Sequence, residues 1–291
     1  MSSTKCRAYK CPRQVKIGQV VTFDWGRGRF PAAAQPLAPY LGGKRNLASA
    51  IGAQIEATEH NVYAEPFFGM GGIFFRRNTS ARIEVINDIS REVVTLLRVV
   101  QRHHQALCDL IRYQVASRSE FEALLKLDPS SLTDLERAAR FLFLQRTGYG
   151  GKICGRTFGV SKGAASRFNA LVLRDSIDAV HERLANVVIE CLSWQAFIRR
   201  YDHRGILFYL DPPYWGSEAS YGCDVFERND FTLLADTLRG LKGKFIMSIN
   251  DVPEVRDLFG WAQIRSVRTT YSISSSGSRL PAKELIVSSE A

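Results

Sequence analysis

Short apolar runs, each closed by a polar residue, alternate along this chain with stretches of helical periodicity. Such runs predict strands buried on both faces, and they occupy residues 61–66, 82–88, 187–191, 205–210 and 244–251. Between them, apolar residues recur at helical spacing, most clearly from Arg91 to about Tyr113. Alternating strands and helices predict an α/β fold in which helices cover both faces of a doubly wound, mostly parallel sheet.

The remaining pattern adds further helices, a hairpin and an irregular middle. Helices are predicted through about residue 57, starting in 73–77, and over 121–127, 135–146, 194–201 and 231–241, with Asp230 as the N-cap of the last. Gln263–Tyr271 and Glu284–Ser288 predict a closing antiparallel pair. Residues 148–169 begin with Gly148-Tyr149-Gly150-Gly151 and predict an irregular segment.

The strand at 206–210 ends in a distinctive way. Its apolar residues stop at Asp211, which Pro212, Pro213 and Tyr214 follow. Two prolines cannot continue a ladder, so the strand ends here, at the edge where ligands bind in open α/β sheets. A carboxylate beside a flat ring matches a planar group that carries an NH2, such as a nucleobase. A plain strand end with a solvated aspartate is the alternative, but the four residues together favour a site.

A glycine-rich turn follows the strand at 61–66. Phe67-Phe68-Gly69-Met70-Gly71-Gly72 lets the backbone pass close to a ligand, although many α/β proteins carry such a turn. Asp88 strengthens the signal, because it closes the next strand about twenty residues on, where an acid accepts the ribose hydroxyls of a nucleoside. Asp88 is also suited to cap the helix that follows it, a role compatible with binding.

Composition and charge indicate a polyanionic partner. The chain has 291 residues, a formal net charge of +10 and a pI of about 9.5, although excess Lys and Arg can also serve solubility. Its length suggests one large domain, or one domain with an insertion. No apolar run reaches membrane-spanning length, and the basic N-terminus lacks the apolar core of a signal peptide.

The cysteines and histidines indicate no metal site. The cysteines are Cys6, Cys11, Cys108, Cys154, Cys191 and Cys223, scattered without a C-x-x-C pair. The histidines show no ligand spacing either. Scattered cysteines in a chain of this size predict reduced thiols in a cytoplasmic setting.

One-sided charge marks the middle of the chain. From residue 137 to residue 174 there are eight basic residues and no acidic one. The basic residues are Arg137, Arg140, Arg146, Lys152, Arg156, Lys162, Arg167 and Arg174. Interleaved with Tyr149, Phe158 and Phe168, they predict a surface that follows nucleic-acid phosphates; a solvated loop is the alternative.

Residues 1–35 do not look like core. Basic residues dominate them, and only Val20–Phe23 predicts a short strand. Residues 31–39 predict a Pro/Ala linker. We expect a mobile extension here, and a basic arm that lies on nucleic acid is the alternative.

Four motifs together resemble one enzyme family. They are Tyr40-x-Gly-Gly-Lys44, Glu65-Pro66-Phe67-x-Gly-x-Gly-Gly72, Asn87-Asp88 and Asp211-Pro-Pro-Tyr214. They occur in the order found in the S-adenosylmethionine-dependent DNA adenine-N6 methyltransferases of the Dam-like class. The resemblance implies a Rossmann-like catalytic domain over 36–111 and 187–291 that binds S-adenosylmethionine, with an antiparallel C-terminal hairpin. It places a target-recognition insert at 112–186 and leaves 1–35 outside.

The resemblance also implies roles for the matching positions. S-adenosylmethionine would contact Tyr40, Lys44, Glu65, Pro66, Phe67, Gly69, Gly71, Asp88, Trp194 and Asp211. Catalysis would fall to Asp211, Pro212, Pro213 and Tyr214. We predict DNA contacts at Arg146, Lys152, Arg156, Lys162, Arg167 and Arg279. The family usually has an Asp-Phe-like pair before its last motif; here Ser193-Trp194 offers a stacking face for the cofactor's adenine without the carboxylate.

The implied reaction is methyl transfer to N6 of an adenine flipped out of double-stranded DNA. The amine is a poor nucleophile because its lone pair is delocalised into the ring. Two acceptors, Asp211 and the Pro212 carbonyl, would draw the N6 nitrogen toward tetrahedral geometry. Tyr214 would stack on the base. No metal is required, and we expect a monomer. The same transfer to RNA or to cytosine N4 remains an alternative, as does an inactive DNA-binding homologue. Cellular, phage and restriction-modification settings are all compatible with the sequence.

Overall fold

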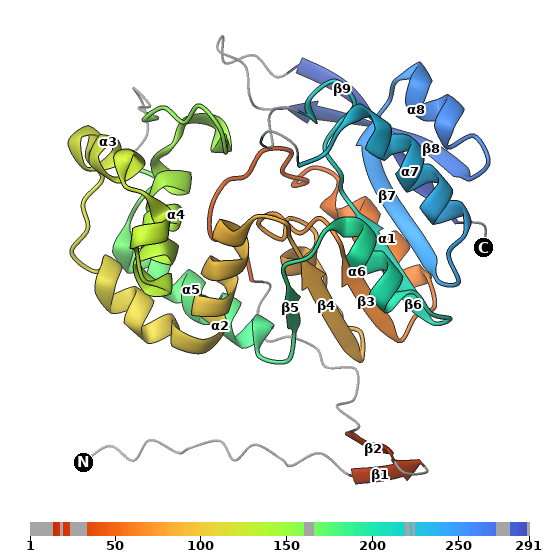
Figure 1. Cartoon of the computed structure of the whole chain (residues 1–291), viewed down its shortest axis with the longest axis horizontal. Coiled ribbons are helices and arrows are strands. Elements are labelled where there is room, and N and C mark those ends of the chain that lie inside the picture. Colours follow the sequence, from red (N-terminus) through yellow and green to blue (C-terminus); the bar gives the residue numbers. More distant parts are fainter. Residues whose placement is uncertain are drawn as a thin grey trace.

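A seven-stranded mixed sheet forms the centre of the computed structural model of this chain (Figure 1). The structure describes residues 14–17, 20–23, 34–159, 166–218, 222, 225–271 and 280–289. The strand order is β5-β4-β3-β6-β7-β9-β8. The parallel strands are β3 (Val62–Glu65), β4 (Ile83–Asn87), β5 (Val188–Glu190), β6 (Ile206–Leu210) and β7 (Lys244–Asn250). The antiparallel edge consists of β8 (Gln263–Tyr271) and β9 (Leu280–Ser288).

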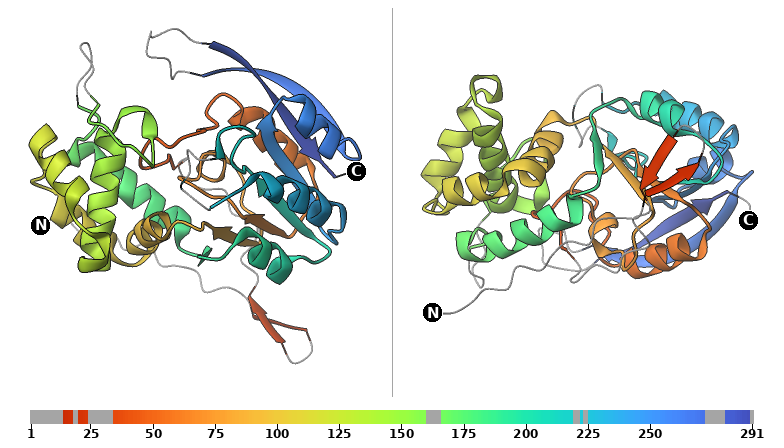
Figure 2. Two further views of the ribbon diagram at one scale, coloured as in Figure 1. Left: turned by 45° about the horizontal axis from the view of Figure 1, so that its top comes forward. Right: turned by 90° about the horizontal axis from the view of Figure 1, so that it is seen from below.

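Helices cover both faces of this sheet (Figure 2). One face carries α6 (Trp194–Tyr201), α7 (Arg228–Arg239) and α8 (Pro253–Leu258), and the other carries α1 (Ala48–Ala57) and α2 (Arg91–Ile111). Every residue of β6 is buried. Ile206, Phe208 and Leu210 pack on the side of α6, α7 and α8, and Leu207 and Tyr209 pack on the side of α1 and α2. The predicted doubly wound α/β fold with an antiparallel C-terminal hairpin is confirmed.

The direction of winding reverses between β3 and β6. The chain leaves β3 toward β4 and β5 on one side, then returns to β6 and continues to β7 on the other. The loops after β3 and β6 therefore diverge and leave a crevice at the carboxyl edge of the sheet, the usual ligand site of such folds. Glu65 closes β3 and Asp211 follows β6, so both carboxyl groups stand at this crevice.

The chain between α2 and β5 forms a helical insert, which lies beside the sheet (Figure 1). Its elements are α3 (Arg118–Lys126), η2 (Pro129–Ser131), α4 (Asp134–Thr147), η3 (Tyr149–Gly151) and α5 (Ala170–Leu184), where η denotes a 3-10 turn. α4 and α5 pack along α2, and Leu107, Phe143 and Ile177 belong to the same continuous core as the α1 face of the sheet. The helix α2 is thus shared between the sheet layer and the insert.

The stretch after the glycine turn does not form the predicted helix. Only a 3-10 turn, η1 (Phe74–Arg76), separates Gly72 from β4. Asn78, Thr79 and Ser80 come next, and these residue types compete with helix formation by bonding to nearby backbone. The chain consequently turns straight into β4.

Two helix starts also differ from the prediction. Asp230 is not the N-cap of α7: Glu227 is, and the Asp230 carboxylate accepts the N–H of Glu227 at 2.8 Å from the third helical position. α5 occupies residues for which no helix was predicted, and Asn169 caps it by accepting the N–H of Leu171 at 3.0 Å.

The predicted Pro/Ala linker is partly core. Ala34, Leu37 and Ala38 are buried against the α1 face, because apolar side chains beside an apolar surface bury even between prolines. The short strand predicted near residue 20 is confirmed as β2 (Val20–Phe23), which pairs with β1 (Gln14–Ile17) in an antiparallel hairpin. The remaining basic residues of the N-terminal extension lie outside the described residues.

Candidate active site

Asp211 is held through one of its two carboxylate oxygens. Lys44 Nζ lies 2.7 Å from Asp211 Oδ1, and Ser248 donates its hydroxyl to the same oxygen at 3.2 Å. The Ser248 hydroxyl is in turn 2.7 Å from the hydroxyl of Tyr209. No described residue donates to Oδ2. Asp211 is therefore fixed on one side and open on the other, as an acceptor for a ligand requires.

Lys44 joins the loop before α1 to the Asp211–Tyr214 turn. Its side chain is 3% exposed, and Nζ also donates to the Gly42 carbonyl at 2.9 Å. The ammonium lies 4.5 Å from the centre of the Tyr214 ring. A buried ammonium is tolerated only with such partners, because desolvation disfavours an isolated charge. The contacts of this one side chain thus bring the Tyr40–Lys44 motif and the Asp211–Tyr214 motif together.

Burial perturbs the acids at the crevice. It raises the pKa of Asp211 to about 6, against the lowering effect of Lys44. Glu65 accepts the hydroxyl of Tyr63 at 2.6 Å, and its burial raises its pKa to about 8. At neutral pH Asp211 is accordingly mostly ionised and Glu65 mostly protonated. Neighbouring acids whose pKa values are raised and separated are typical of functional sites.

Asp88 closes the glycine turn. The Gly69 N–H donates to Asp88 Oδ2 at 2.7 Å, and the Ser90 N–H donates to Oδ1 at 2.8 Å. Burial raises the pKa of Asp88 to about 6. Asp88 is not the N-cap of α2, since Ser90 takes that position by accepting the N–H of Val93. Each oxygen of Asp88 carries one backbone bond and keeps a further acceptor site.

Two glycines of the turn have left-handed backbone conformations, with φ of +53° at Gly69 and +70° at Gly71. A Cβ at Gly69 would lie 2.9 Å from the Tyr40 ring. A Cβ at Gly71 would lie 2.6 Å from the rings of Phe68 and Phe75. The turn therefore requires glycine at both positions, and Tyr40 packs directly on the backbone of the turn.

Two asparagines to which the sequence assigned no role hold the loops of the site. Asn87, at the end of β4, donates to the carbonyls of Pro66 and Leu192 at 2.9 and 3.0 Å and accepts the Leu192 N–H at 2.8 Å. Asn250, at the end of β7, accepts the N–H of Trp215 at 2.9 Å and donates to its carbonyl at 3.0 Å. The sequence signal for both is a polar residue at the end of an apolar strand.

An aromatic wall, made of Phe67, Trp194 and Phe226, bounds the site on one side. The ring centre of Phe67 lies 6.4 Å from that of Trp194 and 5.9 Å from that of Phe226. Trp194 is the first residue of α6, and Ser193 is the N-cap of that helix. Phe226 was not predicted, because it lies in an irregular loop where no periodicity points to it. The wall offers apolar faces to a planar ring.

These groups surround a cavity of about 1090 Å³ between the sheet edge and the insert. The predicted site residues that line it are Tyr40, Lys44, Glu65, Pro66, Phe67, Gly69, Asp88, Arg146, Arg167, Trp194, Asp211 and Pro213. Those outside its lining are Gly71, Lys152, Arg156, Pro212 and Tyr214. Lys162 and Arg279 fall outside the described residues.

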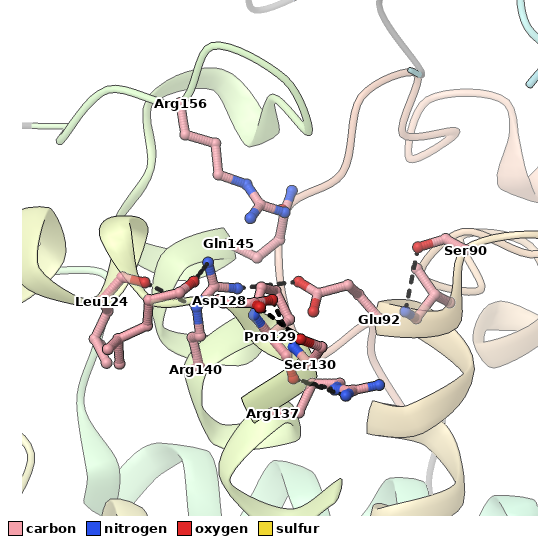
Figure 3. Close-up of polar contacts among 12 residues, drawn as sticks. Ser90, Glu92, Leu124, Asp128, Pro129, Ser130, Arg137, Arg140, Gln145 and Arg156 are labelled. Atoms are coloured by element: carbon pink, nitrogen blue, oxygen red, sulfur yellow. Dashed lines mark hydrogen bonds and ion pairs between the residues drawn. The ribbon is translucent and has the colours of Figure 1, made fainter. Parts of the chain in front are cut away.

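Two of the eight basic residues between 137 and 174 have structural roles (Figure 3). Arg140 is 6% exposed; it donates to the Leu124 carbonyl at 2.8 Å and pairs with Glu92 at 3.3 Å. Arg137 donates twice to the Pro129 carbonyl, at 3.0 and 2.7 Å. Part of the one-sided charge thus ties helices together instead of facing solvent.

Two further basic residues of the insert are partly buried. Arg156 donates to Gln145 at 3.1 Å, and Arg146 donates to the Leu37 carbonyl at 2.6 Å. Lys152, Arg167 and Arg174 are exposed; Arg167 lines the cavity, and Lys152 lies between the lining residues Gly150 and Ile153. Lys152 and Arg167 are therefore the clearest candidates for contact with a polyanion near the cavity.

Residues 40–273 match the model of a known family, described as the D12 class N6 adenine-specific DNA methyltransferases. The matched range includes Lys44, the glycine turn, Asp88, the insert and Asp211. The chain belongs to this family. It is an enzyme that methylates adenine at N6 in DNA, as the four motifs predicted.

Two known relatives are methyltransferases by name, and one of them is a DNA adenine methylase. The chain is 26% identical over 252 residues to the DNA adenine methylase of Escherichia coli (strain K12), covering 82% of this chain and 88% of the relative. It is 22% identical over 227 residues to the Type II methyltransferase M.CviBI of Paramecium bursaria Chlorella virus NC1A, covering 77% and 86%. A SAM-dependent methyltransferase structure from Agrobacterium tumefaciens is 10% identical, with a TM-score of 0.38 over 98% of this chain and 71% of that chain.

Within the described residues, no helix is long and apolar enough to cross a membrane. In the same part of the chain, no three His, Cys, Asp or Glu side chains come together as a metal ion would need. Cys108, Cys154 and Cys191 are free thiols there.

Proposed function

We propose that the cavity binds S-adenosylmethionine beside a flipped-out adenine, and that Asp211 accepts the N6 amine for methylation. One observation carries this proposal: Asp211, with its open Oδ2, shares a cavity with Asp88, which closes the glycine turn. The cavity of about 1090 Å³ is at the upper limit of ordinary ligand pockets, about 300–1,000 Å³. It therefore has room for two ligands.

The residues at the glycine turn fit S-adenosylmethionine. Asp88 keeps acceptor sites for the ribose hydroxyls, and the aromatic wall offers apolar faces to the cofactor's adenine. The ionised carboxylate of Asp211 favours a cationic sulfonium nearby. When bound, S-adenosylmethionine supplies an electrophilic methyl group.

On the substrate side, Asp211 and the Pro212 carbonyl would receive the two N6 hydrogens of adenine. These bonds draw the lone pair of N6 out of the ring and stabilise the positive charge that develops during attack on the methyl group. Tyr214 would stack on the extruded base, and stacking worth about 1–3 kcal/mol offsets much of the few kcal/mol that flipping requires. After attack N6 carries one surplus proton, which the Asp211 carboxylate would accept.

Methylation of defined nucleic acids tests this function. We expect label from S-adenosylmethionine to appear in N6-methyladenine of double-stranded DNA, with the enzyme acting as a monomer. Label confined to RNA, or to N4-methylcytosine, would contradict the proposed substrate, and absence of label would identify an inactive DNA-binding homologue. Sequencing the modified adenines in DNA from expressing cells would give the recognition sequence.

The rate of methyl transfer should fall as the pH drops through about 6. Only ionised Asp211 can both accept a hydrogen bond from the amine and stabilise the positive charge that develops on N6. Burial raises the pKa of Asp211 to about 6. Single-turnover rates from about pH 5 to about pH 8 measure this fall in rate at low pH, the acid limb of the pH profile. Saturating S-adenosylmethionine keeps Asp88, whose pKa is also about 6, from contributing through binding. A rate that is flat over this range would contradict the role of Asp211.

We propose that residues 112–186 are the target-recognition insert and that DNA lies over the mouth of the cavity. Lys152→Ala and Arg167→Ala should each weaken DNA binding and lower the slope of its salt dependence by about one unit. Equilibrium binding across a salt series measures both effects. Lys242→Ala, exposed just before β7 at the edge of the sheet opposite the cavity, is the matched control and should bind as the wild type does. Unchanged slopes would remove Lys152 and Arg167 from the interface.

Arg156→Ala is a less direct test of DNA binding. Arg156 is partly buried and donates to Gln145, which itself donates to the carbonyls of Pro39 and Gly151 at 2.9 and 2.7 Å. Loss of Arg156 would therefore also disturb packing between the insert and the loop before α1. DNA contacts by Arg146, Lys162 and Arg279 remain part of the same proposal.

A further inference from the structure

Asp211 stands at the end of a short chain of hydroxyl groups inside the sheet. Tyr209 precedes Asp211 by two residues, so both side chains point to the same face. Ser248 lies beside them on the neighbouring strand, β7. The Tyr209 hydroxyl is 2.7 Å from Ser248 Oγ, which is 3.2 Å from Asp211 Oδ1. Tyr209 and Ser248 are 1% and 0% exposed, so no solvent competes for these bonds.

This chain of hydroxyls has a defined direction. A serine hydroxyl has a single proton, and Ser248 donates it to Asp211. The bond between Tyr209 and Ser248 must then use the proton of Tyr209. Burial raises the pKa of Tyr209 well above its ordinary value, so that proton is retained. Both O–H dipoles consequently point toward Asp211 Oδ1.

The charged groups around Asp211 come from several elements. Lys44 reaches it from the loop before α1, Glu65 stands at the end of β3, and Glu284 lies in β9. Burial and Glu284 oppose its ionisation, whereas Lys44 and the Ser248 hydroxyl favour it. Two donors from different elements restrict the carboxylate more than either alone, because each limits rotation about the bond made by the other.

We propose that Ser248 is a positioning residue for methyl transfer: with Lys44, it holds Asp211 Oδ1 so that Oδ2 faces the target amine. Tyr209 acts through Ser248 by keeping its hydroxyl in the donating orientation. This inference rests on the proposed role of Asp211 as the acceptor of N6. Alignment of the acceptor matters because small misplacements of reacting groups slow a transfer strongly.

Single-turnover methylation of unmethylated plasmid DNA measures the chemical step. At saturating DNA and S-adenosylmethionine, Ser248→Ala should slow it by about tenfold or more, as loss of a hydrogen bond to a charged group does. Tyr209→Phe should slow it less, because Ser248 keeps its own proton. Since Tyr209 acts through Ser248, the double variant should be no slower than Ser248→Ala. Equilibrium affinities for DNA and for S-adenosylmethionine should stay unchanged.

The pH profile distinguishes positioning from general loosening. Loss of the Ser248 bond should move the acid limb of the rate upward by about one pH unit, and a deficit should persist at about pH 8.5, where Asp211 is ionised in both proteins. Ser288→Ala and Tyr201→Phe are matched controls: Ser288 is a buried serine of β9, Tyr201 donates to Glu190, and none of these three residues lines the cavity. Both should leave the rate and the acid limb unchanged.

Wild-type rates and an unshifted limb in Ser248→Ala would overturn the inference. Additive effects in the double variant, or equal slowing in the two controls, would overturn it as well, because they indicate a general effect on the sheet. If Ser248→Ala does not fold, a wild-type rate and an unshifted limb in Tyr209→Phe are sufficient to overturn it. An active Asp211→Ala would instead refute the proposed function, so the two failures are distinguishable.

Discussion

Asp211→Ala should reduce the rate of methyl transfer by about a thousandfold while the protein remains folded. Asp211 is the charged acceptor proposed for N6, and removal of a preorganised group at the site of developing charge lowers rates by about 10²–10³. Here a second effect adds to the first. The ammonium of Lys44, now 2.7 Å from Asp211, would stay buried and oppose the positive charge that develops on N6. Single-turnover methylation measures the loss.

Asp211→Asn is a sharper version of the same experiment. It keeps the shape of the side chain but replaces Oδ2 with an NH2 group. This group would face the N6 amine of adenine and could not accept its hydrogen, so the variant should be as inactive as Asp211→Ala. Asp236→Ala, exposed on α7, is the matched control and should retain full activity. Transfer at the wild-type rate by either variant of Asp211 would show that Asp211 is not the acceptor.

Gly71→Ala should destabilise the protein by about 2–5 kcal/mol, combining about 1–2 kcal/mol for a left-handed non-glycine residue with about 1–3 kcal/mol for overpacking. Gly71 has a φ of +70°, and a Cβ there would lie 2.6 Å from the rings of Phe68 and Phe75. Both rings are buried in the core. A loss of this size is a large part of a typical folding free energy, about 5–15 kcal/mol. Denaturant unfolding measures it.

Gly155→Ala separates the two contributions to this loss. Gly155 also has a positive φ, +58°, but a Cβ there would meet no atom within 4 Å. This variant should therefore lose only the conformational part, about 1–2 kcal/mol. Equal losses in the two variants would mean that the contact with Phe68 and Phe75 contributes nothing. A binding measurement with S-adenosylmethionine should also show weaker affinity for Gly71→Ala alone, since the glycine turn belongs to the cavity.

Much of the fold was predictable because its signals are local. A strand buried on both faces has to be apolar along its whole length, as Ile206–Leu210 is, and two prolines end it at a defined residue. The amphipathic pattern of Arg91–Ile111 predicted α2 for the same reason. Where local signals are weak, prediction failed: η1 replaces a helix because turn-forming residues follow it, and α5 was missed inside a segment notable mainly for its charge.

The basic insert illustrates a second limit. Charge counted along the sequence does not distinguish a guanidinium that faces DNA from one that bonds a carbonyl inside the protein. Arg137 and Arg140 proved to be of the second kind, while Lys152 and Arg167 are exposed. Burial depends on which segments pack together, and the sequence pattern of the insert does not contain that information.

The sequence by itself determined the α/β fold, the glycine turn with Asp88, and Asp211 at the end of its strand. Each depends on residue types within short segments and on the order of those segments along the chain. Only the tertiary structure decided how Asp211 is held, because Lys44 comes from the loop before α1 and Ser248 lies 37 residues further along the chain. Asn87 and Asn250 join loops in the same way. Contacts between distant segments arise from the winding of the sheet, which brings together side chains that no local pattern connects.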